Sequence, residues 1–327
     1  MKIRNIVLFA VLLCMLCVVS ACRPGAKYVE IAAPSLEGAL LNEAETQQIA
    51  VLLPKGYNDS VSYPVLYFLP GFGAEHKSVT SLVARATADE PYIVVVVNGT
   101  SKLGGCFYTN SPVSGNWADF VTRDVVGYVD SHYNTIADAT ARGIAGHSMG
   151  GFGALNLAAQ YPGLFGHVYA MSPGLFDENG VADSGLDFEL LSEKSADFAT
   201  LDEYIKYVNN LLWPKNFTFA YASAFAFDDT AELPHIDFTS RERYADGFGN
   251  WEPRLETLRS LDSLAIEYGE NDELSWIPRG AAHLCELLRE HEIPHSELPF
   301  DGKHADQLSD RLRNHMSPFF ATAFGMQ

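Results

Sequence analysis

The chain of 327 residues carries 22 basic and 41 acidic side chains, which give a formal net charge of −19 at pH 7. Nucleic acid is therefore excluded as a natural partner, because phosphate backbones are bound by clustered Lys and Arg. Hydrophobic residues make up 47% of the sequence, and a chain of this length and composition can bury the core of one large domain.

The first residues are predicted to be a targeting segment rather than part of the fold. Two basic residues precede an unbroken apolar run over residues 6–19, which is short for a membrane span. The run ends in Val-Ser-Ala-Cys at residues 19–22, which resembles a bacterial lipobox, and Arg23 replaces the aspartate that often retains lipoproteins in the inner membrane. We expect residues 1–22 to be a lipoprotein-type signal peptide and the protein to be exported and anchored through a lipid on Cys22, in the outer membrane or periplasm. Ordinary cleavage after the same small residues is the alternative.

Two of the five cysteines, Cys106 and Cys285, remain in the folded part of the chain once this segment is set aside. An exported location permits a disulfide between them, but thiols so far apart in sequence are often unpaired, so both states stay open. Outside the apolar run the chain has no C-x-x-C motif, and it has no phosphate-binding G-x-x-x-x-G-K-[ST] motif. We therefore expect no cofactor.

Strand-like and helix-like segments alternate from Lys27 onward. Near-continuous apolar runs over residues 63–69 and 92–97 are typical of strands covered on both faces. Six further strands are predicted, at residues 28–33, 48–53, 142–146, 166–171, 263–268 and 295–300. Helices are predicted at residues 78–89, 117–132, 150–161, 278–291 and 305–324. This alternation predicts an α/β fold, with a mostly parallel central sheet and helices on both faces.

Residues 146–150 read Gly-His-Ser-Met-Gly, at the point where a predicted strand meets a predicted helix. This is the G-x-S-x-G pattern of a nucleophile elbow, in which a serine lies on a sharp turn whose neighbours must lack bulk. Gly151, Gly153 and Ala154 continue the run of small side chains. A glycine-rich turn with a surface serine is the plainer interpretation of the same residues, so the rest of the chain has to decide.

A serine nucleophile needs a base to take its proton and a carboxylate to orient that base. In the α/β-hydrolase order, the acid and then the histidine follow the serine, each on a loop after a strand. Asp272 follows the strand predicted at residues 263–268, and His304 follows the strand predicted at residues 295–300. Glu270 is closer to its strand end and is the alternative acid.

Three other histidines are less suited to act as the base. His295 begins a predicted strand and His315 falls inside a predicted helix, so neither has a loop's reach to the serine. His147 is adjacent to Ser148 but points elsewhere on an elbow, and we expect it to pack against, or support, other residues of the site.

The developing oxyanion of an acyl-transfer reaction needs hydrogen-bond donors, each worth on the order of 3 kcal/mol of barrier. The backbone N–H of Met149, directly after the serine, should supply one. The second is expected from the glycine-containing loop after residues 63–69, where Phe72 is our choice and Gly73 the alternative.

The regular alternation stops between residues 174 and 262, which is where a cap would be inserted in a sheet-based hydrolase. Apart from a helix predicted at residues 201–212, this stretch is rich in aromatic residues, most of which should pack a core of its own. Its acidic cluster matches no metal-ligand spacing, so no metal is expected at Asp228, Asp229, Glu232, His235 and Asp237. Residues 23–327 are thus predicted to form a single domain with a cap.

Four tracts of the chain resemble the family known as putative esterases, which includes esterase D (S-formylglutathione hydrolase), feruloyl and acetylxylan esterases and the mycobacterial mycolyltransferases. The tracts read Leu-Pro-Gly-Phe-Gly at 69–73, Gly-Cys-Phe-Tyr-Thr-Asn at 105–110, Asn-Trp-Ala-Asp-Phe at 116–120 and Ala-Gly-His-Ser-Met-Gly-Gly-Phe-Gly-Ala-Leu at 145–155. The resemblance covers roughly residues 48–172 and 264–320. It implies the α/β-hydrolase fold.

The resemblance also implies roles for the residues chosen above. Ser148 would be the nucleophile, Asp272 the acid and His304 the base, with Phe72 and Met149 as oxyanion donors. Two departures are visible: Pro-Gly at 70–71 where many relatives have His-Gly, and Asn-Gly at 98–99 where many have Asp-Gly. The first leaves a backbone donor intact, and the second removes a charge from near the mouth of the site.

These inferences together predict a serine carboxylester hydrolase that works through an acyl-enzyme. Its substrate would be a small-molecule or carbohydrate ester, such as an acyl or feruloyl ester of a carbohydrate. Two alternatives stay open. One is an acyltransferase that passes the acyl group to a sugar hydroxyl, and the other is a catalytically decayed, lipid-anchored binding protein.

Overall fold

The structure is a computed structural model that describes residues 25–326, except 75, 183, 195–197 and 227–240. The expected signal peptide with Cys22 lies outside the described residues. So does the acidic cluster considered above as a metal site, namely Asp228, Asp229, Glu232, His235 and Asp237. Within the described part of the chain, no helix is both long and apolar enough to cross a membrane.

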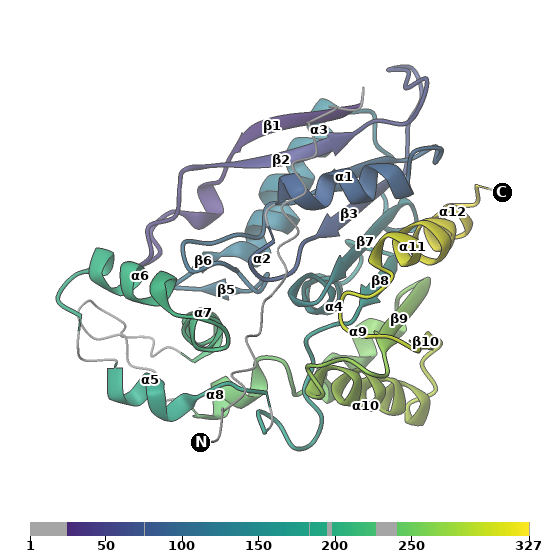
Figure 1. The fold of residues 1–327 in the computed structure, drawn as a ribbon. Helices are drawn as coiled ribbons and strands as arrows, with labels where there is room; N and C mark the ends of the chain where they lie inside the picture. Colours follow the sequence, from purple (N-terminus) through teal and green to yellow (C-terminus); the bar gives the residue numbers. More distant parts are fainter. Residues whose placement is uncertain (1–24, 75, 183, 195–197, 227–240, 327) are drawn as a thin grey trace, which may run out of the picture.

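An eight-stranded sheet forms the centre of the molecule, in the order β1-β2-β4-β3-β7-β8-β9-β10 (Figure 1). Its strands are β1 Ala26–Ala32, β2 Thr46–Leu52, β3 Val65–Leu69, β4 Ile93–Val96, β7 Arg142–His147, β8 His167–Met171, β9 Ser263–Gly269 and β10 Ser296–Phe300. β2 is antiparallel to both neighbours, and every pair from β4 to β10 is parallel. The predicted mostly parallel sheet is therefore confirmed. A short hairpin that was not predicted pairs β5 Asn110–Ser111 with β6 Gly115–Asn116.

The apolar runs in the central strands exist because both faces of the sheet are covered. Every residue of β3 is buried, and its side chains alternate between two separate cores. Val65, Tyr67 and Leu69 belong to one core, and Leu66 and Phe68 belong to the other. A continuous hydrophobic run is what such a doubly covered strand requires.

Helices cover both faces of the sheet, as predicted. One face carries α1 His76–Ala86, α11 Leu308–Arg311 and α12 Ser317–Ala323, and the other carries α2 Trp117–Asp119, α3 Val126–His132, α4 Met149–Gln160 and α10 Trp276–Glu290 (Figure 1). Short 3₁₀ turns lie at Pro34–Leu36, Ala139–Ala141 and Glu252–Arg254. The helix predicted at 117–132 and the closing helix, which begins at 308 rather than 305, each contain a π-helical segment, at Phe120–Val125 and Leu312–Met316. Hydrophobic periodicity does not reveal such local widening.

Between β8 and β9 the chain leaves the sheet and forms a layer of short helices. These are α5 Phe188–Lys194, α6 Leu201–Asn210, α7 Lys215–Phe225, α8 Arg241–Asp246 and α9 Leu255–Arg259. The layer is tied to the body through Phe107, whose ring lies 5.3 to 5.8 Å from the rings of four aromatic residues, Phe217, Tyr221, Phe225 and Phe248. The aromatic residues of this stretch thus pack against the body as well as against one another.

Cys106 and Cys285 are both buried and neither forms a disulfide. Burial raises the pKa of the Cys285 thiol to about 12, and burial raises the pKa of the Cys106 thiol as well. Both side chains therefore act as small apolar core residues. The question that the sequence left open is answered in favour of two free thiols.

Candidate active site

Ser148 lies on a sharp turn between β7 and α4, as the motif predicts. Its backbone has φ 59° and ψ −118°, a left-handed conformation that is costly for a residue with a side chain. The turn is held by hydrogen bonds from its own N–H to the Met171 carbonyl, at 2.9 Å, and from the Gly174 N–H to the Ser148 carbonyl, at 3.2 Å. The serine is thereby fixed at the carboxyl end of β7.

The glycines around the serine are required by contacts between backbones. A Cβ atom on Gly146 would lie 2.2 Å from the Gly150 oxygen, and one on Gly150 would lie 1.9 Å from the Leu69 oxygen. Strand, helix and the end of β3 therefore approach more closely than any side chain allows. This is the physical reason for the two glycines of the motif.

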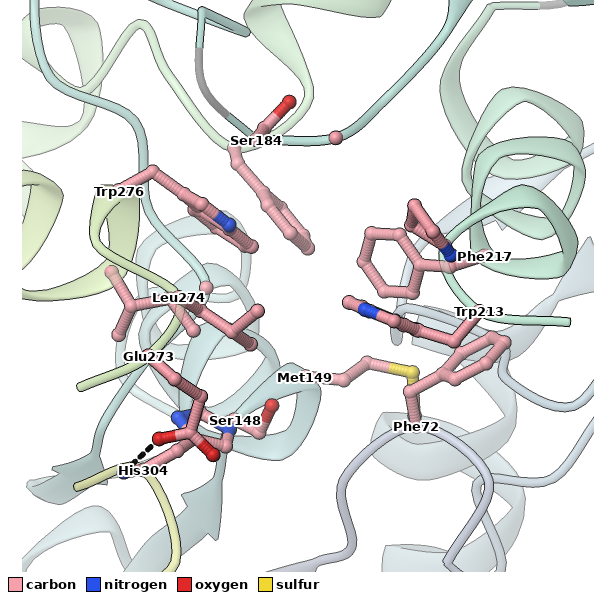
Figure 2. A pocket seen from close by; sticks show the side chains of 15 residues that line it. Phe72, Ser148, Met149, Ser184, Trp213, Phe217, Glu273, Leu274, Trp276 and His304 are labelled. Atoms are coloured by element: carbon pink, nitrogen blue, oxygen red, sulfur yellow. Dashed lines mark hydrogen bonds between the residues drawn. The ribbon is translucent and has the colours of Figure 1, made fainter. Parts of the chain in front are cut away.

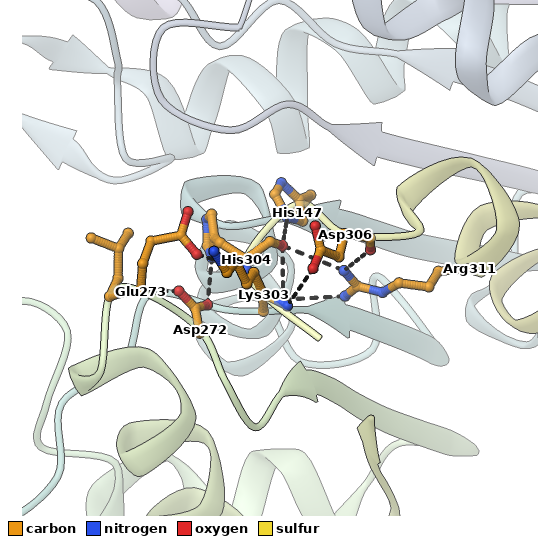
Figure 3. Close-up of polar contacts among 9 residues, drawn as sticks. His147, Asp272, Glu273, Lys303, His304, Asp306 and Arg311 are labelled. Carbon is orange, nitrogen blue, oxygen red and sulfur yellow. Dashed lines mark hydrogen bonds and ion pairs between the residues drawn. The ribbon is translucent and has the colours of Figure 1, made fainter. Parts of the chain in front are cut away.

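Asp272 and His304 are paired by a hydrogen bond. The His304 Nδ1–H donates to Asp272 Oδ2 over 2.7 Å, and the other carboxylate oxygen accepts the Leu274 N–H at 2.8 Å (Figure 3). The Asp272 side chain is 0% exposed. This bond assigns the proton to Nδ1 and leaves the lone pair of Nε2 free to accept another proton. Glu270, the alternative acid, is exposed to solvent.

Ser148 and His304 line the same cavity (Figure 2). They are brought together because β7, β9 and β10 are parallel, so their carboxyl ends meet at one edge of the sheet. Residues more than a hundred positions apart in sequence thus converge on one site, at the edge where ligands bind in open α/β sheets.

The backbone carbonyl of His304 accepts hydrogen bonds from two side chains, the partly buried His147 and the buried Arg311. His147 Nε2–H donates to it at 2.9 Å, and one Arg311 guanidinium N–H donates to it at 3.4 Å (Figure 3). Burial, followed by the neighbouring His304, keeps the pKa of His147 well below its usual range, so His147 acts as a neutral donor. It lies against the predicted base and supports it, as expected from its place on the elbow.

Arg311 belongs to a buried charge network that sequence reasoning missed. Its Nε lies 3.2 Å from Glu267, whose side chain is 1% exposed and which also accepts hydrogen bonds from His315 at 2.9 Å and Tyr169 at 3.1 Å. Another guanidinium N–H donates to the hydroxyl of Ser172 at 3.1 Å. The network joins the closing helices to β8, β9 and the His304 loop. Its members are scattered in sequence, and no spacing pattern marks them.

His295 and His315, which the sequence argument set aside as bases, are engaged elsewhere. The Nδ1 of His295 bonds to the Ile293 carbonyl at 2.9 Å, while His315 bonds to Glu267. Among the described residues, the group of side chains with metal-ligand spacing is Cys285, His295 and Glu297. It lies at the start of β10, away from the cavity at the strand's other end.

The loop after β3 lies against the elbow. A Cβ on Gly71 would be 3.3 Å from the Ser148 Cβ. The Gly73 N–H already donates to the Gly104 carbonyl at 2.8 Å, which disfavours Gly73 as an oxyanion donor and leaves Phe72 as the better choice. Met149 is the first residue of α4, where a backbone N–H has no partner within the helix.

The cavity above Ser148 has a volume of about 640 Å³ and is mainly aromatic (Figure 2). Phe72 comes from the loop after β3, and the other rings come from the helical layer and from the start of α10. They are Trp213, Phe217, Phe248 and Trp276. Glu273 contributes a carboxylate on the His304 side of the cavity (Figure 2).

Several solved structures of known proteins have a similar architecture. The structure is similar to a ferulic acid esterase, with TM-score 0.57 and 22% identity over 92% of this chain and 99% of that one. It is also similar to an S-formylglutathione hydrolase from Agrobacterium tumefaciens, with TM-score 0.58 and 15% identity over 90% and 94% of the two chains. The fold is the α/β-hydrolase fold.

The sequence matches the family described as Putative esterase over residues 44–231, which is more than half of the chain. It is 34% identical over 152 residues to Esterase Rv1288 of Mycobacterium tuberculosis (strain ATCC 25618 / H37Rv), a match that covers 44% of this chain and 31% of that protein. The chain therefore spans about a third of the length of the curated relatives it matches. It belongs to the putative esterase family.

The close approach at the elbow predicts the effect of adding one methyl group. We expect Gly150→Ala to lower the free energy of unfolding by about 3 kcal/mol or more, because the atom it would strike is the backbone oxygen of Leu69. Gly127→Ala is the matched control, since a Cβ on that exposed helical glycine meets nothing within 4 Å. That variant should be neutral or more stable by up to about 1 kcal/mol. Urea denaturation measures both, and equal stability of the two variants would contradict the steric argument.

The buried charge network predicts a strong dependence on Arg311. Arg311→Leu should lower the free energy of unfolding by about 3–5 kcal/mol, because it leaves the buried Glu267 without its cationic partner. Adding Glu267→Gln should recover a large part of that loss. Arg313→Leu changes an exposed arginine of the same helical segment and should cost less than about 0.5 kcal/mol. Chemical denaturation of the four proteins tests the prediction, which fails if Arg311→Leu is no worse than Arg313→Leu.

Proposed function

We propose that the protein is a serine carboxylester hydrolase. The Ser148 oxygen attacks the ester carbonyl while His304 Nε2 takes its proton, and Asp272 holds the imidazole in the required tautomer. The N–H groups of Met149 and Phe72 stabilise the oxyanion. The carbon–oxygen bond to the alcohol then breaks, and the alcohol leaves with the proton from His304. Water, deprotonated by the same histidine, releases the acid and restores the serine.

The observation that carries this proposal is the hydrogen bond between the buried Asp272 and His304, which lines the same cavity as Ser148. A neutral imidazole whose Nδ1 proton is held by a buried carboxylate is prepared to accept a proton at Nε2. A serine held on a sharp turn at the same sheet edge is the group that would supply that proton. Membership of the putative esterase family supports the same reaction.

The substrate we propose is an acyl ester of a carbohydrate, with an aromatic acyl group such as feruloyl favoured. Five aromatic side chains line a cavity of about 640 Å³, which falls in the size range of small-molecule sites. Flat rings give an aromatic acyl group large apolar contacts and favourable edge-to-face geometry. Structural similarity to a ferulic acid esterase is consistent with this choice.

We also propose that the protein is exported and held at the cell envelope by acylation of Cys22. The support is the sequence alone: a basic start, an apolar run over residues 6–19 and the Val-Ser-Ala-Cys at residues 19–22. Multiple acyl chains on one cysteine would hold the protein stably on a membrane, whereas a single chain binds only marginally.

Ser148→Ala should lower kcat for short-chain p-nitrophenyl esters by about 10⁴-fold or more, because members of a triad act as a unit. The variant should also lose labelling by a fluorophosphonate probe. Ser131→Ala removes an exposed serine of α3 and should retain both properties. Undiminished turnover in Ser148→Ala would refute the nucleophile. Absence of labelling in the wild-type protein would favour a decayed binding protein.

A panel of methyl ferulate, acetylated xylan and short acyl esters tests the substrate proposal. We expect the highest kcat/KM with methyl ferulate, and a selective loss of that activity in Phe217→Ala, which removes a ring from the cavity wall. Equal loss on acetyl esters would argue against an aromatic acyl site. Transfer of the acyl group to added sugar, instead of release of free acid, would favour the acyltransferase alternative.

Intact-mass measurement on membrane fractions tests the anchor. The mature protein should carry an acylated Cys22 at its first position, and Cys22→Ala should move the protein out of the membrane fraction. A mature protein without an acyl adduct would show that ordinary signal cleavage operates instead.

A further inference from the structure

The described residues that line the cavity include an acidic side chain but no lysine or arginine. Among the described residues that line it, Glu273 is the one that carries a carboxylate, and none is a lysine or an arginine. His304 is the other titratable group on its wall, and the Asp272 beneath it is buried. A substrate with a negative charge would therefore find no lysine or arginine in this wall to pair with it, and His304 is cationic only while it carries the serine's proton.

Glu273 is held close to the reacting groups. It directly follows Asp272 in the loop after β9, and its Oε2 accepts the backbone N–H of His304 at 3.3 Å. Figure 2 shows its carboxylate beside His304 and near Ser148, at one edge of the cavity, and the side chain is exposed to solvent. Figure 3 shows the same side chain on the far side of His304 from Arg311, so the guanidinium does not face it.

The position of Glu273 decides which part of the substrate meets its charge. In the proposed reaction, His304 delivers a proton to the departing oxygen, so the leaving group must lie on the His304 side of the cavity. An anionic leaving group would then be placed next to the carboxylate of Glu273, which is exposed to solvent at the edge of a mainly aromatic cavity. Like charges near a protein surface, at an effective dielectric constant of about 20, still repel more strongly than in bulk water. A neutral alcohol carries no such penalty.

We propose that Glu273 makes this site selective for esters of uncharged alcohols, such as carbohydrate hydroxyls, and against anionic leaving groups such as glutathione, whose carboxylates give it a net negative charge. The inference rests on the proposed hydrolase function and names the substrate class of that site. Discrimination of this kind comes from a repulsive element rather than from an added attraction. It separates a carbohydrate esterase from a glutathione thioesterase on the same fold.

A matched pair of esters measures the effect: 4-acetoxybenzamide, with a neutral leaving group, and 4-acetoxybenzoate, with an anionic one. After each value is corrected for the rate of hydroxide-catalysed hydrolysis of the same ester, the wild-type kcat/KM should be about tenfold or more higher for 4-acetoxybenzamide than for 4-acetoxybenzoate. This is the effect expected for two like charges about 10 Å apart at an effective dielectric constant near 20. Glu273→Gln keeps an oxygen for the His304 N–H but removes the charge, and the preference should fall about tenfold.

Glu270→Gln is the control, because it removes the same charge from an exposed residue of the same loop that does not line the cavity. It should keep the wild-type preference. Raising the salt concentration from about 0.05 M to about 0.5 M should narrow the preference in the wild type and in Glu270→Gln, and change it little in Glu273→Gln.

An unchanged preference in Glu273→Gln would overturn the inference. An equal fall in the preference caused by the Glu270→Gln substitution itself would overturn the inference too. The overall net charge of −19, rather than the position of Glu273, would then be the cause. Failure of the proposed function has a different signature: wild type and Ser148→Ala would hydrolyse both esters equally slowly. A hydrolase with no preference between the two esters is thus distinguishable from a protein that is not a hydrolase.

Discussion

Direct contact between the backbones of β3, β7 and α4 is the constraint on which the site depends. With no room for a Cβ at Gly146 or Gly150, the chain can turn only sharply, and Ser148 takes a left-handed conformation. Such a conformation costs about 1–3 kcal/mol and persists only where the surroundings over-determine it. The fully buried strands β3 and β8, on either side of β7, provide the stabilisation that offsets this cost, so the stability of the sheet holds the serine in place.

The opposite wall of the site is held by polar contacts instead. The His304 loop has no regular structure of its own, yet its carbonyl accepts hydrogen bonds from His147 and Arg311, and its imidazole is held by Asp272. Burial lowers the pKa of the Arg311 guanidinium, while the neighbouring Glu267 opposes that change. The ion pair between Arg311 and Glu267 thus helps to hold the His304 loop in place, whereas the serine is held by packing.

Much of this architecture was predictable from the sequence because the signals are local. Each predicted strand is found within two residues of its observed ends. For central strands such as β3 and β8 the reason is that a doubly buried strand needs an apolar run. The order of Ser148, Asp272 and His304 could be predicted because each follows a strand whose carboxyl end must reach the same edge. The sequence preferred Asp272 to Glu270 and Phe72 to Gly73, and the hydrogen bonds that favour the same residues in the structure are tertiary contacts that no local pattern encodes. Arg311 and Glu267 meet only because the closing helices pack on β9, and the aromatic wall depends on how the helical layer folds back.

The direction of β1 has a consequence for a tethered molecule. Both β1 and β4 are antiparallel to β2, so they run the same way, and Ala26 lies at the amino end of the parallel strands, opposite the edge that carries Ser148. Cys22 is four residues before Ala26, and an extended segment of that length spans at most about 14 Å. If Cys22 is acylated as we propose, the anchored segment joins the described fold at the amino edge of the sheet. Ser148 lies at the opposite edge, so the tether would not need to cross the site to reach the lipid.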